Sequence, residues 1–168
     1  MFYRGSLLSP IPPFISVFIF NRDIRLEEKK ILPRIGSLIE SPGFYPNLTG
    51  TENLRIFAKL RGIPRTDAIE QALKLVNLPY KDKKLYSQYS LGMKQRLNIA
   101  QAIFENQKII LLDEPTNALD EDAVQLIYKI IREEKSRGAT IIVATHHKED
   151  LKEVCDVILK IAEGNENK

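Results

Sequence analysis

One short apolar run constrains the fold of this chain more than any other feature. Residues 108–112 end in an unbroken Ile109-Ile-Leu-Leu112 stretch, and Asp113 and Glu114 follow it directly. A run this short, bounded by polar residues, is typical of a strand buried on both faces of a parallel sheet. A second such run, Ala139–Ala144, lies beyond a predicted helix over residues 121–137. Strand, helix and strand in this order predict an α/β fold with a parallel sheet.

The remaining elements follow from apolar period, helix caps and the breaks at Gly and Pro. Capping residues predict helices that start after Thr49, Thr66 and Ser90, so the middle of the chain, about residues 49–105, reads as a helical insert. Pro10, Pro12 and Pro13 predict an irregular arm over residues 1–15. Further strands are expected at 16–20, 35–39 and 157–161, with a short helical turn at 27–32 and a helix at 148–155.

Composition limits the class of protein. The 168 residues are 43% hydrophobic and 28% charged, as in a globular protein of one domain, or of one domain with a small lobe. With 25 basic and 22 acidic residues the net charge is only +3, which does not favour a nucleic-acid partner. The single Cys155 excludes a disulfide framework within the chain. The apolar run at residues 11–20 is too short to span a membrane, and we expect a cytoplasmic chain.

The carboxyl ends of the two apolar runs carry the first candidate site. Because ligands of open parallel sheets bind at this edge, Asp113, Glu114 and His146 are expected to lie close together. One carboxylate could hold Mg²⁺ while the next activates a water, and the imidazole could donate to a phosphate oxygen. The alternatives are an acidic strand end that solvates the loop and a loop histidine bonded to the backbone. His147 has no assigned partner and is expected to be exposed.

A second candidate lies at the start of the third helix. Ser90 and Gly92 stand at its amino end, where free N–H groups and the helix dipole attract anions such as phosphate. An ordinary helix cap explains Ser90 equally well.

Taken together, these motifs resemble the ATP-binding subunits of ABC transporters, especially the bacitracin and lantibiotic-resistance branch of exporters. Residues 109–114 look like the Walker B motif, 117–120 like the D-loop, His146 like the switch histidine and 90–96 like the signature helix. Residues 35–49 are similar to the Q-loop region, with Glu40 where the family usually has Gln. The resemblance covers roughly residues 17–161, within a partial ABC ATPase domain at 16–168.

The resemblance implies a P-loop NTPase-like parallel sheet flanked by helices, with a helical insert, that is incomplete at the amino end. It also implies ATP and Mg²⁺ as cofactors, a membrane permease as partner, and a peripheral place at the inner face of the cell membrane. The resemblance implies that Asp113 and Glu40 bind Mg²⁺, that Glu114 is the general base, and that His146 binds the γ-phosphate. It also implies that Ser90 and Gly92 bind ATP across a dimer and that Asp120 bridges the subunits. Glu40 and residues 44–48 would touch the permease.

The chain departs from the family in one respect that matters. A Gly-rich phosphate loop ending in Lys and Ser or Thr is expected in such a site, and none of the eight glycines is followed by Lys. The resemblance also implies a homodimer, or a heterodimer with an intact ABC subunit. Two interpretations of the missing loop remain: the chain acts in trans against an intact subunit, or it is the remnant of a truncated or frameshifted reading frame. A soluble, non-transport ABC ATPase and a non-enzymatic competitor for the permease are the rival functions. On the remnant interpretation, the chain alone hydrolyses no ATP.

Overall fold

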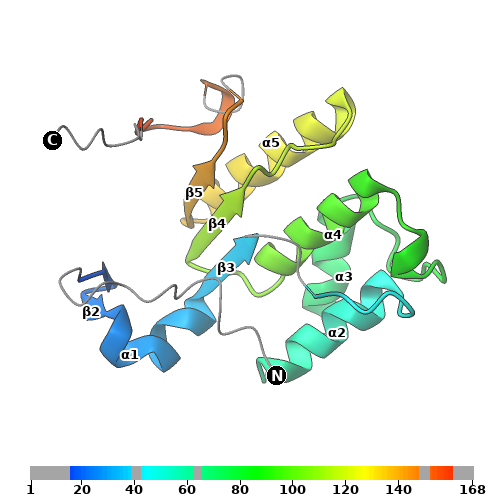
Figure 1. The fold of residues 1–168 in the computed structure, drawn as a ribbon, viewed down its shortest axis with the longest axis horizontal. Helices are drawn as coiled ribbons and strands as arrows, with labels where there is room; N and C mark the ends of the chain where they lie inside the picture. Colours follow the sequence, from blue (N-terminus) through cyan, green and yellow to red (C-terminus); the bar gives the residue numbers. More distant parts are fainter. Residues whose placement is uncertain (1–15, 39–42, 63–65, 148–151, 161–168) are drawn as a thin grey trace, which may run out of the picture.

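A three-stranded parallel sheet organises the molecule (Figure 1). The computed structural model describes residues 16–38, 43–62, 66–147 and 152–160. The strands run in the order β3 (Ile35–Leu38), β4 (Ile109–Asp113) and β5 (Thr140–Ala144). Between β3 and β4 lie the helices α2 (Gly50–Leu60), α3 (Thr66–Leu75) and α4 (Leu91–Ile103), with the short turn η2 (Tyr86–Gln88); α5 (Glu121–Ser136) joins β4 to β5. The predicted α/β class with flanking helices is confirmed.

The first described residues form a small hairpin instead of a strand of the main sheet. β1 (Phe18–Ile19) and β2 (Arg22–Asp23) pair antiparallel, and α1 (Ile24–Ile31) with the turn η1 (Leu32–Arg34) leads into β3. Phe20 and Asn21 have φ values of 53° and 59°, the left-handed conformation that a tight two-residue hairpin turn needs. The strand predicted over residues 16–20 is therefore shorter than expected, because the chain reverses at Phe20.

The helix starts follow the predicted capping chemistry. The Thr49 hydroxyl accepts from the Glu52 N–H at 3.2 Å, while the Glu52 carboxylate accepts from the Thr49 N–H at 2.8 Å, so the capping box is complete. Ser90 caps α4 by accepting from the Met93 N–H at 3.2 Å. α3 includes Thr66 as its first residue, so this helix begins one residue before the predicted boundary, a difference common at helix ends.

The two faces of the sheet are covered unequally. Ile110 and Leu112 point into the main core, beside α4 and α5, and are 1% and 4% exposed. On the opposite face, Ile109 and Leu111 pack half-buried against the cluster of Ile24, Ile31 and Ile35. The expectation that both apolar runs are buried on both faces is wrong for β5, where Ile142 is 56% exposed. The reason is that α1 covers β3 and β4 but does not extend over β5.

A groove runs along the outer edge of β5. Its volume is about 740 Å³, and its lining comes from β5, from two residues of α5 and from residues 154–159. An ion pair of 2.7 Å between Arg132 and Glu153 ties the far wall to α5. The strand predicted at 157–161 is wrong over its described part: residues 157–160 form no strand, and Val157 is 75% exposed. The groove lies between this segment and the edge of β5 and keeps the two backbones too far apart to pair.

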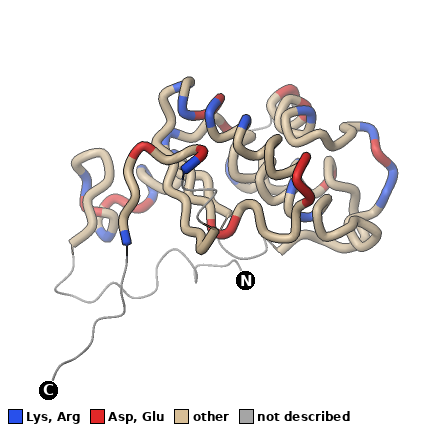
Figure 2. Tube along the Cα trace, turned by 90° about the horizontal axis from the view of Figure 1, so that it is seen from above, with Lys and Arg blue, Asp and Glu red and all other residues tan. Residues whose placement is uncertain are grey.

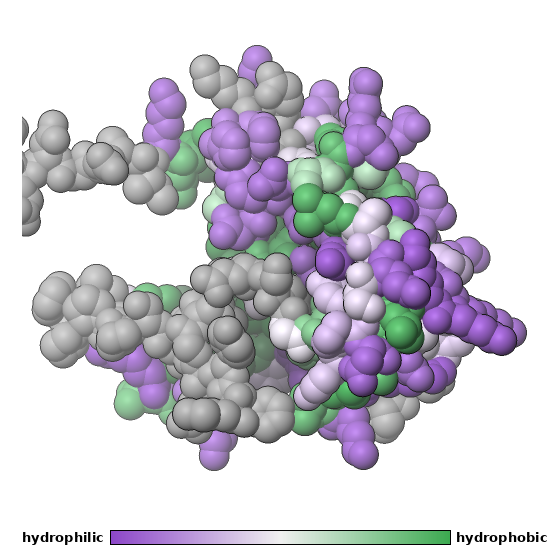
Figure 3. Space-filling model, turned by 45° about the vertical axis from the view of Figure 1, so that its right-hand side comes forward, coloured by the Kyte–Doolittle hydropathy of each residue, from purple (hydrophilic) through white to green (hydrophobic). Residues whose placement is uncertain are grey.

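Charge is spread over the described surface. In Figure 2, blue Lys and Arg residues alternate with red Asp and Glu residues along the trace. In Figure 3, green apolar atoms are visible between the projecting purple side chains. Of the helices that the structure describes, none is both long enough and apolar enough to cross a membrane.

The sheet and α4 approach each other very closely at Gly36. A Cβ atom at this position would lie 1.8 Å from the carbonyl oxygen of Ala102 in α4. Since such a contact is impossible, β3 can lie against α4 only with glycine here.

Gly36→Ala should therefore lower the free energy of unfolding by about 3 kcal/mol, because strand and helix must move apart. Urea denaturation followed by circular dichroism measures the loss. Gly43→Ala is the matched control, since a Cβ there meets no atom within 4 Å. Equal stability of the two variants would contradict the close contact.

A buried carboxyl lies at the end of the helical region. The Glu105 side chain is 1% exposed, and its Oε1 lies 2.9 Å from the Arg61 Nε. Arg61 also donates through Nη2 to the carbonyl of Pro33 at 3.0 Å, which ties α2 to the segment before β3. Burial raises the pKa of Glu105 to about 6, although the Arg61 charge opposes the shift.

The folded state thus holds the Glu105 proton more tightly than the unfolded chain does, because the pKa of this carboxyl in the unfolded chain is 4.5. This contribution to stability is complete below the unfolded pKa and is lost as the pH rises through about 6. The Glu105→Gln side chain is neutral at every pH, so its free energy of unfolding does not fall with the ionisation of this group. Between about pH 4 and about pH 8 the variant should therefore gain about 2 kcal/mol of unfolding free energy relative to the parent. Denaturation curves across this range measure the difference. Glu133→Gln, on the exposed face of α5, is the control and should show no such gain.

Candidate functional site

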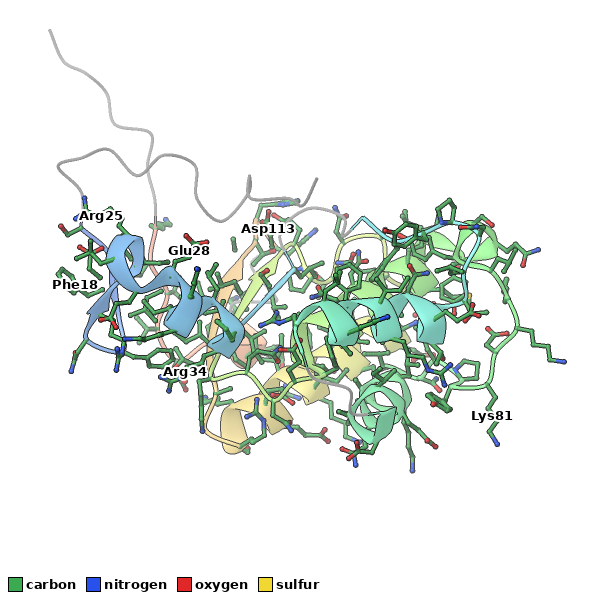
Figure 4. The ribbon with its side chains drawn as sticks, turned by 90° about the horizontal axis from the view of Figure 1, so that it is seen from below. Phe18, Arg25, Glu28, Arg34, Lys81 and Asp113 are labelled. Carbon is green, nitrogen blue, oxygen red and sulfur yellow. The ribbon has the colours of Figure 1, made fainter. Side chains whose placement is uncertain are left out.

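The end of β4 delivers two neighbouring carboxylates to the edge of the sheet. Asp113 is the last residue of the strand and pairs in register with Ala144 of β5. The N–H of Glu114 then donates to the Ala144 carbonyl at 2.8 Å, which extends the pairing one residue beyond the strand. Glu114 has a φ of 44°, a conformation that is costly for a residue with a side chain. Figure 4 labels Asp113, whose side chain is exposed.

The Glu114 carboxylate is held by the residues that follow β5. Oε1 accepts from the His146 N–H at 3.1 Å and lies 2.7 Å from His146 Nδ1, while Oε2 accepts from the Thr145 hydroxyl at 3.2 Å. Because a carboxylate only accepts, the contact assigns the Nδ1 proton to His146 and leaves Nε2 facing away from Glu114. Glutamate and histidine from neighbouring strand ends thus form one hydrogen-bonded unit.

These contacts set the charge of the site. Partial burial raises the pKa of the Glu114 carboxyl, but the hydrogen bonds from His146 and Thr145 outweigh it, and the net shift is downward. Glu114 is therefore ionised at neutral pH and can accept a hydrogen bond from a water.

The start of α4 lies beside the loop that follows β4. A Cβ on Gly92 would lie 3.6 Å from the Leu119 side chain and 3.9 Å from the Ala118 carbonyl. At the end of this loop Asp120 caps α5, where its Oδ1 accepts from the Ala123 N–H at 2.9 Å. Ser90 and Asp120 are both exposed helix caps, and Gly92 packs against the loop between them.

Gln95 positions the backbone of the candidate site, and the sequence did not predict this role. Gln95 of α4 donates through Nε2 to the carbonyls of Glu114 and Pro115, both at 3.1 Å. It therefore fixes the backbone that carries the candidate base. Gln95 lies within the recognised signature segment, but a glutamine on a helix gives no sign in the sequence of which carbonyls it will meet.

The structure brings the predicted residues into two groups. Glu114 and His146 are in contact, with Asp113 adjacent along the chain, whereas Ser90, Gly92 and Asp120 gather around the amino ends of α4 and α5. Glu40 lies outside the described residues. His147, expected to be exposed, is half-buried, and the centroid of its ring lies 4.1 Å from that of His146.

The donor set at the sheet edge fits a magnesium ion. Mg²⁺ takes hard oxygen ligands and keeps several waters, so an exposed carboxylate such as Asp113 at a strand end is a suitable ligand. The fit rests on donor chemistry, and Glu114 is oriented toward His146 instead.

Comparison with known proteins identifies the family. The model of the ABC transporter family matches residues 16–117. The chain is 42% identical over 147 residues to the bacitracin transport ATP-binding protein BcrA of Bacillus licheniformis, a match that covers 87% of this chain and 48% of that protein. It is 38% identical over 136 residues to the lantibiotic transport ATP-binding protein SrtF of Streptococcus pyogenes, covering 81% of this chain and 59% of SrtF. The chain thus spans about half the length of the curated relatives it matches.

Solved structures agree with this assignment. The ATP-binding subunit of an ABC transporter superposes with a TM-score of 0.73 at 25% identity, covering 84% of this chain and 60% of that one. A dimeric ATP-binding cassette in a post-hydrolysis state, bound to ADP and Pi, gives a TM-score of 0.69 at 26% identity, covering 83% and 66%. Since the family model matches more than half of the chain and the fold agrees with these structures, the chain belongs to the ABC transporter family.

Proposed function

We propose that this chain is an ATP-binding subunit of an ABC exporter of the bacitracin and lantibiotic type, which couples MgATP hydrolysis to a membrane permease. The observation that carries the proposal is the Glu114 carboxylate held against His146 at the end of β4. A carboxylate that is ionised and fixed by three hydrogen-bonding groups can orient a water for attack on a phosphate.

Each of the three residues at the sheet edge has a separate role in the proposed hydrolysis of ATP. Asp113 would hold Mg²⁺, which would supply positive charge to neutralise the charge that develops on the transferred phosphoryl group. Glu114 accepts the proton of the attacking water. His146 orients Glu114 through its Nδ1–H, and its outer nitrogen, when protonated, donates to the γ-phosphate.

The start of α4 is suited to complete the site of a second subunit. Ser90 is exposed, and the neighbouring Leu91 is 66% exposed, so this helix end is accessible to a partner. Its free N–H groups and dipole favour a phosphate, and Gly92 allows a close approach. We assign Ser90 and Gly92 to ATP bound by the partner, and Asp120 to the contact between the subunits. One solved relative is a dimer with bound ADP and Pi, which supports this arrangement.

The proposed contact with the permease lies on the loop before α2. The buried Asn53 holds this loop: its side-chain amide accepts from the Tyr45 N–H at 2.7 Å and donates to the Tyr45 carbonyl at 3.1 Å. Tyr45 is 50% exposed, whereas Phe44 is buried against Phe57 and Tyr86. The exposed residues 45–47 therefore form the described part of the proposed contact, and Phe44 supports it from within. Glu40, which lies outside the described residues, is assigned to the same contact by the family resemblance alone. In this role the chain lies at the cytoplasmic face of the membrane.

The given sequence has no glycine-rich loop followed by Lys, the element that binds the phosphates of ATP in sites of this kind. The chain alone should then show no magnesium-dependent ATP hydrolysis. An ABC subunit that carries the loop should hydrolyse ATP with this chain as partner, because Ser90 and Gly92 would complete the site of that subunit. Hydrolysis by the isolated chain that disappears in Glu114→Gln would contradict this expectation.

In a chain that joins this sheet edge to a phosphate-binding loop, Glu114→Gln should lower the rate of ATP hydrolysis by a factor of about 100 or more, since the amide cannot take the proton of the attacking water. Release of phosphate measures the rate, and retention of labelled ATP on the protein shows that binding persists. Glu121→Gln, in the exposed first turn of α5, is the control and should keep the parental rate. A parental rate in Glu114→Gln would remove Glu114 from the role of base.

A further inference from the structure

Glu114, His146 and His147 bring three potential metal ligands together. One carboxylate oxygen and one nitrogen from each ring all lie within 4.8 Å of one another. Glu114 follows β4, and both histidines follow β5, so the pairing of these strands creates the cluster. The proposed ATPase chemistry uses Glu114 and His146 but gives no role to His147.

We propose that these three residues form a binding site for a single borderline transition-metal cation, such as Zn²⁺. Imidazole nitrogens suit Zn²⁺, Ni²⁺ and Cu²⁺, whereas Mg²⁺ and Ca²⁺ prefer oxygen ligands throughout. Three protein ligands with a fourth position open to water are a common zinc arrangement. The site therefore discriminates against the Mg²⁺ that Asp113 is proposed to hold.

Thr145 preorganises the ligands. Its hydroxyl donates to Glu114 Oε2 at 3.2 Å and accepts from the His147 N–H at 3.1 Å. With Oε2 occupied by this bond, Oε1 is the oxygen that faces His146 Nδ1. Outer partners of this kind orient metal ligands and reduce the ordering that binding requires.

Only small movements convert the hydrogen-bonded cluster into a coordination site. The metal would take the place of the Nδ1 proton between His146 and Glu114, where nitrogen and oxygen are now 2.7 Å apart. Tetrahedral bonds of about 2.0–2.1 Å require a ligand separation of roughly 3.3 Å. The His146 side chain is 73% exposed and can turn without displacing core residues.

A water can complete the coordination shell. A shallow pocket of about 280 Å³ adjoins the cluster and is lined by His147, by residues 116–119 and by two residues of α5. The exposed Asn117 in this lining is suited to hold a metal-bound water. The metal and its water therefore reach the site directly from solvent.

The test is titration of the untagged 168-residue chain with Zn²⁺ against a chromophoric chelator, followed by Co²⁺ as a spectroscopic probe. The expected results are one ion per chain, a visible absorption band typical of four-coordinate Co²⁺, and no competition from Mg²⁺. His147→Ala and Glu114→Gln should each weaken Zn²⁺ binding by more than about tenfold, since loss of even an outer-shell partner costs that much. Cys155→Ser and Glu121→Gln are the controls and should bind as the parent does.

Unchanged affinity in His147→Ala, or loss of binding in Cys155→Ser, would overturn the site. Circular dichroism confirms that each variant is folded, and His147→Gln replaces the alanine variant if that one is not. The readout is metal binding alone, so the outcome is independent of whether the chain takes part in ATP hydrolysis.

Discussion

The pairing of β4 with a strand on each side determines where the candidate functional groups lie. Leu112 is in register with Leu38 of β3, and Asp113 with Ala144 of β5. A shift of one residue would turn Ile110 and Leu112 out of the core, so burial locks this register. The bond from the Glu114 N–H to the Ala144 carbonyl then holds Glu114 in its left-handed conformation. Burial of the core side chains thus fixes the position of the Glu114 carboxylate beside His146.

Helix α4 connects this edge to the surface proposed for a partner subunit. Toward its carboxyl end, the Ala102 carbonyl lies against Gly36 of β3, and nearer its amino end Gln95 binds the carbonyls of Glu114 and Pro115. The helix is thus attached to two strands of the sheet at points nearly two turns apart. A displacement of the exposed Ser90 end would act directly on the backbone of the candidate base.

The sequence predicted the features that follow from local chemistry and hydrophobic pattern. The capping box at Thr49, the cap at Ser90 and the strand that ends at Asp113 all depend on residues close together in the chain. The exposure of β5 and the absence of a strand at 157–160 depend instead on which neighbours cover them, and short apolar runs carry no such information. The links made by Gln95 and Thr145 were equally unpredictable, because each joins groups that only the tertiary fold brings together.

The register of β3 with β4 also determines the order in which the molecule can assemble. Ile35 pairs with Ile109, so the loop closed by this contact contains all of α2, α3 and α4. Helices form through local contacts, whereas the pairing of β3 with β4 must first overcome the entropy cost of closing this long loop. The sheet should therefore form late, on a helical region already in place. Since Thr145, His146 and His147 join it only with β5, the last strand of the sheet in chain order, an intact site is a sign that folding is complete.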